Sequence, residues 1–205
     1  INTTLSMNIL VTGSPVATTG DFLVVNKPTT QAGLGIGNVR PQGATANDVT
    51  IQYFNLTGAT ITPTAAELYM FANFRGLAST IALTPTGVAA NSTNEQLFSV
   101  TGVAPGELLF LSKGSEQVGL GLAGCRVAGN NQIGITFLNV SSAAITPSAA
   151  ETYTYFSSSG LSANSNLMVY GVNVGTQIAA LSTASTNTWV VTETALTMTS
   201  IVASD

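Results

Sequence analysis

The sequence predicts an all-β protein: two tandem small β-sandwich or barrel-like domains from an internal duplication, plus a C-terminal β extension. Apolar runs are short, as in FLVV at 22–25 and LLFL at 108–111, and turns rich in Gly, Ser, Thr and Asn separate them. A nine-residue stretch also occurs twice, as ITPTAAELY at 61–69 and ITPSAAETY at 145–153, with seven of the nine positions identical. Such a repeat indicates a repeated structural unit.

The repeat extends well beyond these nine residues. Its offset is 86 residues from Gly20 through Arg40 and 84 residues from Ile51 onward, so the loop before Ile135 is shorter in the second copy. We therefore expect a β module at 1–77, a second at 78–160 and the extension at 161–205. Further matches are Gly20-Asp21-Phe22-Leu23 with Gly106-Glu107-Leu108-Leu109, Gly33-Leu34-Gly35 with Gly119-Leu120-Gly121, Arg40 with Arg126, and Ile51, Tyr53 and Asn55 with Ile135, Phe137 and Asn139.

Strands are expected where residues alternate between two faces, as at 49–56, or form short apolar runs between turns. Pro63 and Pro147 lack a backbone N–H, so each is expected at a strand start or a sheet edge. A helical turn at 65–68 remains an alternative by propensity. The strands of the extension fit a partial third unit, or the completion of a sheet in the second module or in a neighbouring chain. The expected strands are 22–26, 49–56, 67–71, 108–112, 135–140, 151–156, 167–172, 189–192 and 195–201.

Charged residues are few, and the repeat preserves many of them. Only 7% of residues are charged, against roughly 25% in ordinary globular domains. When a chain has few charged residues but keeps them at matching positions of a repeat, each such side chain is expected to have a structural partner. We expect an Arg40–Glu67 ion pair in the first module and an Arg126–Glu151 ion pair in the second, with ordinary solvated charge as the alternative. The matched positions are Asp21/Glu107, Lys27/Lys113, Arg40/Arg126 and Glu67/Glu151.

Several classes of chemistry are disfavoured. The chain has no histidine, which excludes Ser-His-Asp and Cys-His catalysis and His-ligated zinc. The acids are isolated, so no calcium loop or pair of catalytic carboxylates is evident. The glycine run at 33–37 lacks the third glycine of a dinucleotide loop, because Asn38 stands there, and predicts a tight turn or bulge. We expect no enzyme activity, no catalytic residue, no cofactor and no metal.

Charge and hydropathy also bear on partners. The net charge is −4 with five Lys and Arg residues, so no basic face exists to neutralise nucleic-acid phosphates. Mean hydropathy is +0.38, yet no apolar run reaches the roughly 20 residues of a membrane span. No signal-peptide pattern is present, and the chain starts at Ile1, as a processed, truncated or partly read protein would. Cys125 is the single cysteine, and we expect a buried thiol.

Aromatic side chains admit two interpretations. Packing in the core is their ordinary role, and stacking on sugars at the surface is the alternative. Asn55 and Asn139 lie at the ends of strands, where an Asn side chain that bonds the backbone of a turn is expected. The aromatic set is Tyr53, Tyr69, Phe71, Phe74, Tyr153, Tyr155, Phe156 and Trp189.

One combination of segments resembles a module found in structural proteins of tailed bacteriophages. The segments are VTGVAPGE, GDFLVVNKPTTQAGLGI, then an arginine, and VTIQYFNLTGATITPTAAELY. The resemblance covers residues 11–71 and again 100–155, and the related modules occur in head decoration, cement or fibre-like virion components.

This resemblance implies a non-enzymatic virion protein, foremost a decoration or cement subunit that stabilises the phage head by binding across capsid subunits. The implied partners are the major capsid protein or another virion protein and further copies of the chain. The implied location is the capsid surface, with the host cytoplasm during assembly. A fibre or adhesin module that binds host-surface glycans is the second hypothesis, and a glycan hydrolase the third.

Overall fold

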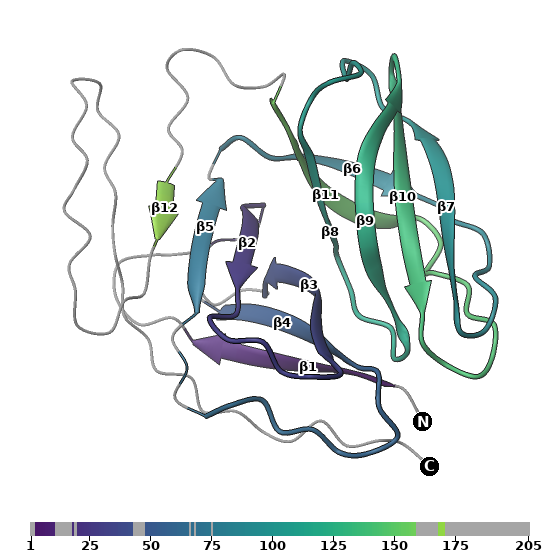
Figure 1. Cartoon of the computed structure of the whole chain (residues 1–205). Helices are drawn as coiled ribbons and strands as arrows, with labels where there is room; N and C mark the ends of the chain where they lie inside the picture. The colour runs from purple at the N-terminus through teal and green to yellow at the C-terminus, as the bar shows by residue number, and fades with distance from the viewer. Residues whose placement is uncertain are drawn as a thin grey trace.

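The described residues of the computed structural model form β-strands and no α-helix, which confirms the all-β prediction (Figure 1). The structure describes residues 3–10, 18, 20–42, 48–65, 67, 69–74, 76–158 and 168–170. The expected strands at 189–192 and 195–201 lie outside these residues, and so does part of the alternative helical turn at 65–68. The strands are β1 (Thr3–Leu10), β2 (Phe22–Asn26), β3 (Leu34–Pro41), β4 (Asp48–Asn55), β5 (Met70–Phe74), β6 (Ser79–Leu83), β7 (Ser92–Ser99), β8 (Leu109–Lys113), β9 (Leu120–Gly129), β10 (Gln132–Asn139), β11 (Glu151–Ser157) and β12 (Met168–Tyr170).

These strands pair into four antiparallel sheets of three strands each. The first half of the chain forms β1-β4-β3 and, together with β12, the sheet β12-β5-β2. The second half forms β7-β10-β9 and β6-β11-β8. Figure 1 shows the two halves side by side, with β3 and β4 of the first half facing the ends of β8 and β9 of the second.

The pairing register repeats between the halves. In the first half Asn55 at the end of β4 pairs with Thr3 and Leu34, and in the second half Asn139 at the end of β10 pairs with Ser92 and Leu120. Each of the two sheets also carries a β-bulge at the same place, which skips one residue of β3 and the equivalent one of β9. The internal duplication and the boundaries 1–77, 78–160 and 161–205 stay predictions, and the repeated register supports them.

The sheets differ at one edge. In the second half β6 pairs with β11, opposite β8. In the first half the corresponding edge of β5 is occupied by β12. The strand expected at 167–172 is therefore present over Met168–Tyr170, but it completes a sheet of the first half, which none of the three alternatives for the extension named.

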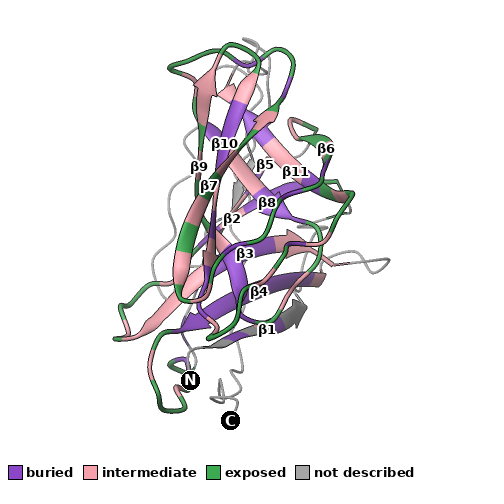
Figure 2. Cartoon of the chain, turned by 90° about the vertical axis from the view of Figure 1, so that its right-hand side faces the viewer, coloured by how far each residue is buried: buried purple, intermediate pink, exposed green. Residues whose placement is uncertain are grey.

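The core lies between the two sheets of each half. Val49, Ile51 and Tyr53 of β4 are fully buried there, and Ile133 and Ile135 of β10 are their counterparts in the second half. β4 is also buried on its other face, as its uninterrupted colour in Figure 2 shows. The second half covers part of that face, so β4 lies in the middle of the molecule rather than at its surface.

Candidate functional site

A buried ion pair joins Lys27 to Glu67 in the first half. Lys27 Nζ lies 2.6 Å from Glu67 Oε2, and the two side chains are only 10% and 7% exposed. The same ammonium group donates to the carbonyl oxygen and the hydroxyl of Thr29, at 2.9 and 3.0 Å. The Thr29 hydroxyl in turn donates to Glu67 Oε1. Both charges therefore keep partners after they leave water, which a buried pair requires.

The second half repeats this pair with Lys113 and Glu151. Lys113 Nζ lies 2.5 Å from Glu151 Oε2, and the side chains are 3% and 9% exposed. Ser115 takes the place of the threonine: it accepts from the ammonium group through its carbonyl and hydroxyl, and its backbone N–H donates to Glu151 Oε1. Each half thus fastens the turn after one strand to the start of another.

A glutamine in each half braces the repeated nine-residue stretch. Gln31 donates from Nε2 to the carbonyl of Thr62 at 2.7 Å and accepts from the backbone N–H of Thr64 at 3.2 Å. Gln117 makes the same two bonds to Thr146 and Ser148, both at 2.9 Å. A glutamine and a lysine therefore hold the repeated stretch in place; in the second half its last three residues, Glu151–Tyr153, already belong to β11.

The predicted arginine–glutamate partners are wrong. Arg40, on β3, lies 3.4 Å from Glu116 of the second half, and Arg126, on β9, lies 2.7 Å from Glu95 on β7. Glu67 and Glu151, the partners predicted for the two arginines, instead pair with lysines. All four predicted residues lie in ion pairs, but Arg126 is 57% exposed and only the two glutamates are buried. The lysines, which the sequence matched between repeats without a partner, complete the buried pairs.

Strand-end asparagines make identical turns, as predicted. Asn139 is fully buried, donates to the carbonyls of Val88 and Ala143 and accepts from the N–H of Ser141. Asn55 makes the corresponding bonds to Ala59 and Thr57. These side chains replace backbone partners where each strand ends, so the asparagines have a structural role.

Two tyrosines lie beside the first ion pair. Burial and the neighbouring Tyr69 hydroxyl raise the pKa of Tyr53, and burial raises the pKa of Tyr69 to about 12. Burial alone would raise the pKa of Glu67, but hydrogen bonds from Lys27 and Thr29 and the lysine charge lower it overall. The carboxylate thus stays ionised and the phenols stay neutral near pH 7.

The two halves meet through side-chain-to-backbone hydrogen bonds. Asn38 of β3 accepts from the backbone N–H of Lys113 at 3.1 Å and donates to its carbonyl at 3.0 Å. Because β8 is an edge strand, this carboxamide caps backbone groups that have no neighbouring strand. Gln52 of β4 donates to the carbonyl of Leu120 at 3.1 Å.

Two further contacts fix the register of the halves. The Thr4 hydroxyl accepts from the N–H of Gly119 at 2.8 Å. The Phe54 ring covers Gly121 so closely that a Cβ atom there would lie 2.1 Å from Cζ of the ring. A side chain other than hydrogen at this position would separate the halves.

An aromatic cluster extends the same junction. Phe22 and Phe74 of the first half pack with Phe110 and Phe156 of the second, with centroid distances of 4.7 to 6.1 Å. Among the residues whose burial the structure describes, no aromatic side chain is strongly exposed. Core packing is therefore the role of the aromatic residues whose burial the structure describes, and Phe71 and Trp189 are outside that set.

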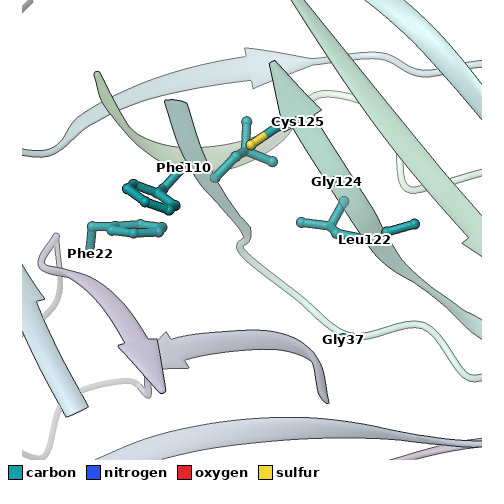
Figure 3. A pocket seen from close by; sticks show the side chains of 8 residues that line it. Phe22, Gly37, Phe110, Leu122, Gly124 and Cys125 are labelled. Carbon is teal, nitrogen blue, oxygen red and sulfur yellow. The ribbon is translucent and has the colours of Figure 1, made fainter. Parts of the chain in front are cut away.

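A small pocket of about 180 Å³ opens beside this cluster (Figure 3). Figure 3 shows the rings of Phe22 and Phe110 side by side, with Cys125 next to Phe110 and Leu122 further along β9. The Cys125 thiol is half-buried and donates to the carbonyl of Leu109 at 3.3 Å. Burial raises its pKa to about 11, so it is a neutral thiol and a poor nucleophile near pH 7.

A larger groove of about 430 Å³ lies on the first half between β2 and β3. Its walls include Val25, Lys27, Gln31, Leu34 and Gly35. The ion pair and the glutamine brace described above hold its rim in place.

The glycine run contains both features predicted for it. Gly33 has a φ of +77° in the turn before β3, where the N–H of Leu34 bonds the carbonyl of Gln31, and Gly37 is the residue that the β-bulge skips. Most of the run is nevertheless strand.

The described residues hold neither a group of three side chains suited to a metal ion nor a helix that is long and apolar enough to cross a membrane. Sequence reasoning missed Asn38, Gln52 and Phe54, which join the halves. Their signal is a difference between the repeats, since the equivalent positions are Gly124, Thr136 and Leu138. Comparisons of the chain with protein-family models, with curated proteins and with solved structures find no match.

Proposed function

We propose that the chain is a non-enzymatic structural protein of a tailed-phage virion, a decoration or cement subunit that binds across capsid subunits and associates with its own copies. Its mechanism is mass action: a subunit that binds only the assembled shell stabilises that shell by its binding free energy. The resemblance of residues 11–71 and 100–155 to phage structural modules supports this role.

The observation that carries the proposal is the use of buried polar groups as braces. The ion pairs Lys27–Glu67 and Lys113–Glu151 occur at matched positions of both halves, and each fastens a loop to a strand. A catalytic group needs freedom to exchange protons with a substrate, whereas these carboxylates already accept several hydrogen bonds. Such bracing suits a rigid building block.

Burial of the aromatic side chains favours this role over glycan recognition. Tyr53, Tyr69 and Tyr153 are fully buried, and Phe156 is 2% exposed. A sugar-stacking surface needs rings that water can reach. The capsid-binding proposal uses instead exposed apolar side chains such as Leu97 and Leu108.

The test is whether phage particles that encode this chain contain it and need it. Particles purified with and without the protein are heated or osmotically shocked, and release of packaged DNA is measured. We expect particles that lack the protein to break at a lower temperature, and added purified protein to restore resistance at a fixed ratio to the capsid protein.

Absence of the chain from purified heads, or unchanged resistance in heads without it, would overturn the proposal. A glycan array tests the adhesin hypothesis, since saturable binding to one class of glycan would favour that hypothesis over the cement role. Quantitative mass spectrometry of separated heads and tails then gives the location independently of any stability effect.

A further inference from the structure

The groove between β2 and β3 is equivalent to a surface that is already occupied in the second half. At the offset of 86 residues, its wall residues Lys27, Thr30 and Gln31 correspond to Lys113, Glu116 and Gln117, and Leu34 and Gly35 correspond to Leu120 and Gly121. The equal pairing of Leu34 with Asn55 and of Leu120 with Asn139 supports this correspondence.

Each of those second-half positions is contacted by the first half. Lys113 bonds Asn38, Glu116 pairs with Arg40, and Gln117 accepts from Thr4. Leu120 accepts from Gln52, and Gly121 lies under the Phe54 ring. The groove is thus the open counterpart of a docking surface that the fold demonstrably uses.

The matching glycines differ in what covers them. A Cβ atom added to Gly121 would collide with Phe54, whereas one added to Gly35 would meet none of the residues that the structure describes within 4 Å. The glycine that lets a side chain approach is therefore present in the groove as well, and no described residue covers it.

The face that enters the docking surface also has a counterpart in the second half, and part of that counterpart is exposed. The residues of the first half that enter the docking surface lie on the outer face of the sheet β1-β4-β3. Their equivalents in the second half lie on the outer face of β7-β10-β9: Thr93, Gly124 and Arg126 are exposed, and Thr136 and Leu138 are half-buried. The strongly exposed Leu97, 53% accessible, belongs to the same face, opposite Gly134.

We propose that the groove between β2 and β3 binds the outer face of the β7-β10-β9 sheet of a second copy of this chain. The contact is heterologous, since one copy supplies the groove and the other the face, and it joins copies head to tail into a ring or a filament. It repeats between molecules the relation by which the two halves of one molecule already bind. The inference deepens the proposed function, because it gives the self-association of a head-binding subunit a defined interface.

The intermolecular contact is weaker than the one within the chain. Gly124 and Leu138 replace the carboxamide of Asn38 and the ring of Phe54, and Thr30 replaces Glu116 as partner for an arginine. The second copy therefore lacks the anchor to the edge backbone and the large ring over the glycine. Association that depends on protein concentration is expected, and tighter contact when the anchors are restored.

Two blocking variants test the head-to-tail geometry in solution. Gly35→Trp fills the groove, and Gly124→Arg blocks the face; both positions have open space at Cβ. Each variant alone is expected to remain monomeric in sedimentation velocity over about a hundredfold concentration range in which the unaltered chain associates. Mixed together they are expected to form a dimer and nothing larger, because one groove and one face remain. Leu108→Lys, at an exposed residue outside both surfaces, is the control and should associate normally.

A variant that associates more tightly tests the interface in a way that misfolding cannot imitate. The double variant Gly124→Asn and Leu138→Phe restores the carboxamide and the ring, and should lower the self-dissociation constant about tenfold or more. Adding Gly35→Trp to that double variant should abolish the gain.

The proposal is overturned if the blocked variants still associate alone, if their mixture forms no dimer, or if the double variant has unchanged affinity. A monomeric chain whose binding to phage heads is lost on Gly35→Trp would also overturn it, by assigning the groove to a capsid partner. Self-association is measured without capsids, so its failure leaves the proposed capsid-binding role standing. A self-associating chain that is absent from particles refutes the proposed function alone.

Discussion

Replacement of Lys113 by Met tests whether the ion pair with Glu151 braces the second half. Methionine keeps most of the volume of the lysine stem but leaves Glu151 as a buried charge without its cation. The two side chains are 3% and 9% exposed, so water cannot take the place of the ammonium group. Loss of one partner of such a pair costs about 3–5 kcal/mol.

The expected loss of stability is measured by urea unfolding at pH 7 and by thermal unfolding. For a chain of this size each kcal/mol lowers the melting temperature by about 2–4 °C, so Lys113→Met should lower the melting temperature by about 6–20 °C. The double variant Lys113→Met and Glu151→Leu removes both charges, and its stability should return to within about 1–2 kcal/mol of the unaltered chain. The double-mutant cycle then gives a large coupling free energy between the two residues.

An exposed pair supplies the matched control. Arg126→Met removes the cation from Glu95, but both side chains are accessible to water, at 57% and 36%. Its effect should be far smaller than that of Lys113→Met, because solvent and salt screen the exposed pair. A loss below about 1 kcal/mol for Lys113→Met would show that Glu151 is solvated or repartnered, and would refute its role as a brace.

Three other predictions concern the same structural devices. The fold lowers the pKa of Glu67, so its carboxylate contributes stability that is complete above the ordinary carboxyl pKa of 4.5 and is lost as the pH falls through the lower folded pKa. Urea midpoints should therefore fall between pH 7 and pH 3, and an identical profile for Glu67→Gln would contradict this prediction. Asn139→Ala removes four hydrogen bonds of a fully buried side chain and should cost about 2–4 kcal/mol in urea unfolding, and a loss near zero would mean that water replaces them. Gly121→Ala should destabilise the chain by about 1–3 kcal/mol through its collision with Phe54, while Gly35→Ala should be neutral or stabilising by up to about 1 kcal/mol; equal thermal unfolding curves for the two variants would contradict the docking of the halves.

The strand pattern was predictable where apolar residues alternate or cluster. Strands expected at 22–26, 49–56 and 108–112 match β2, β4 and β8 within one residue or two. β3 and β9 were missed because their glycines read as turns, although Gly35, Gly37, Gly121 and Gly124 lie within the strands. β7 was missed because Ser, Thr, Asn and Glu occupy a strand with one exposed face, which leaves little apolar signal.

Charge positions were predictable, but their partners were not. Repetition correctly marked Glu67 and Glu151 as residues with structural partners. Both an arginine and a lysine precede the glutamate in each copy of the repeat, and sequence spacing alone does not tell which cation the sheet brings to the carboxylate. Lys27 follows a buried edge strand and so reaches into the half, whereas Arg40 points to the other half.

Agreement and disagreement between the two halves carry different information. Residues that build each half agree, as with Gln31 and Gln117 or Asn55 and Asn139, because both halves need the same braces. On the surface between the halves the agreement is partial: most residues of the groove agree, whereas Asn38, Gln52 and Phe54 on the entering side differ from their counterparts.

The glycine and leucine of the docking surface occur in both halves, while the side chains that enter it differ, as Phe54 and Leu138 do. Gly35 is a glycine like its counterpart Gly121, and no described residue covers it, so the groove around Gly35 retains the chemistry of a docking surface. The residues that would enter this groove from a second copy differ from those within one chain, which explains why the proposed contact between copies is the weaker one.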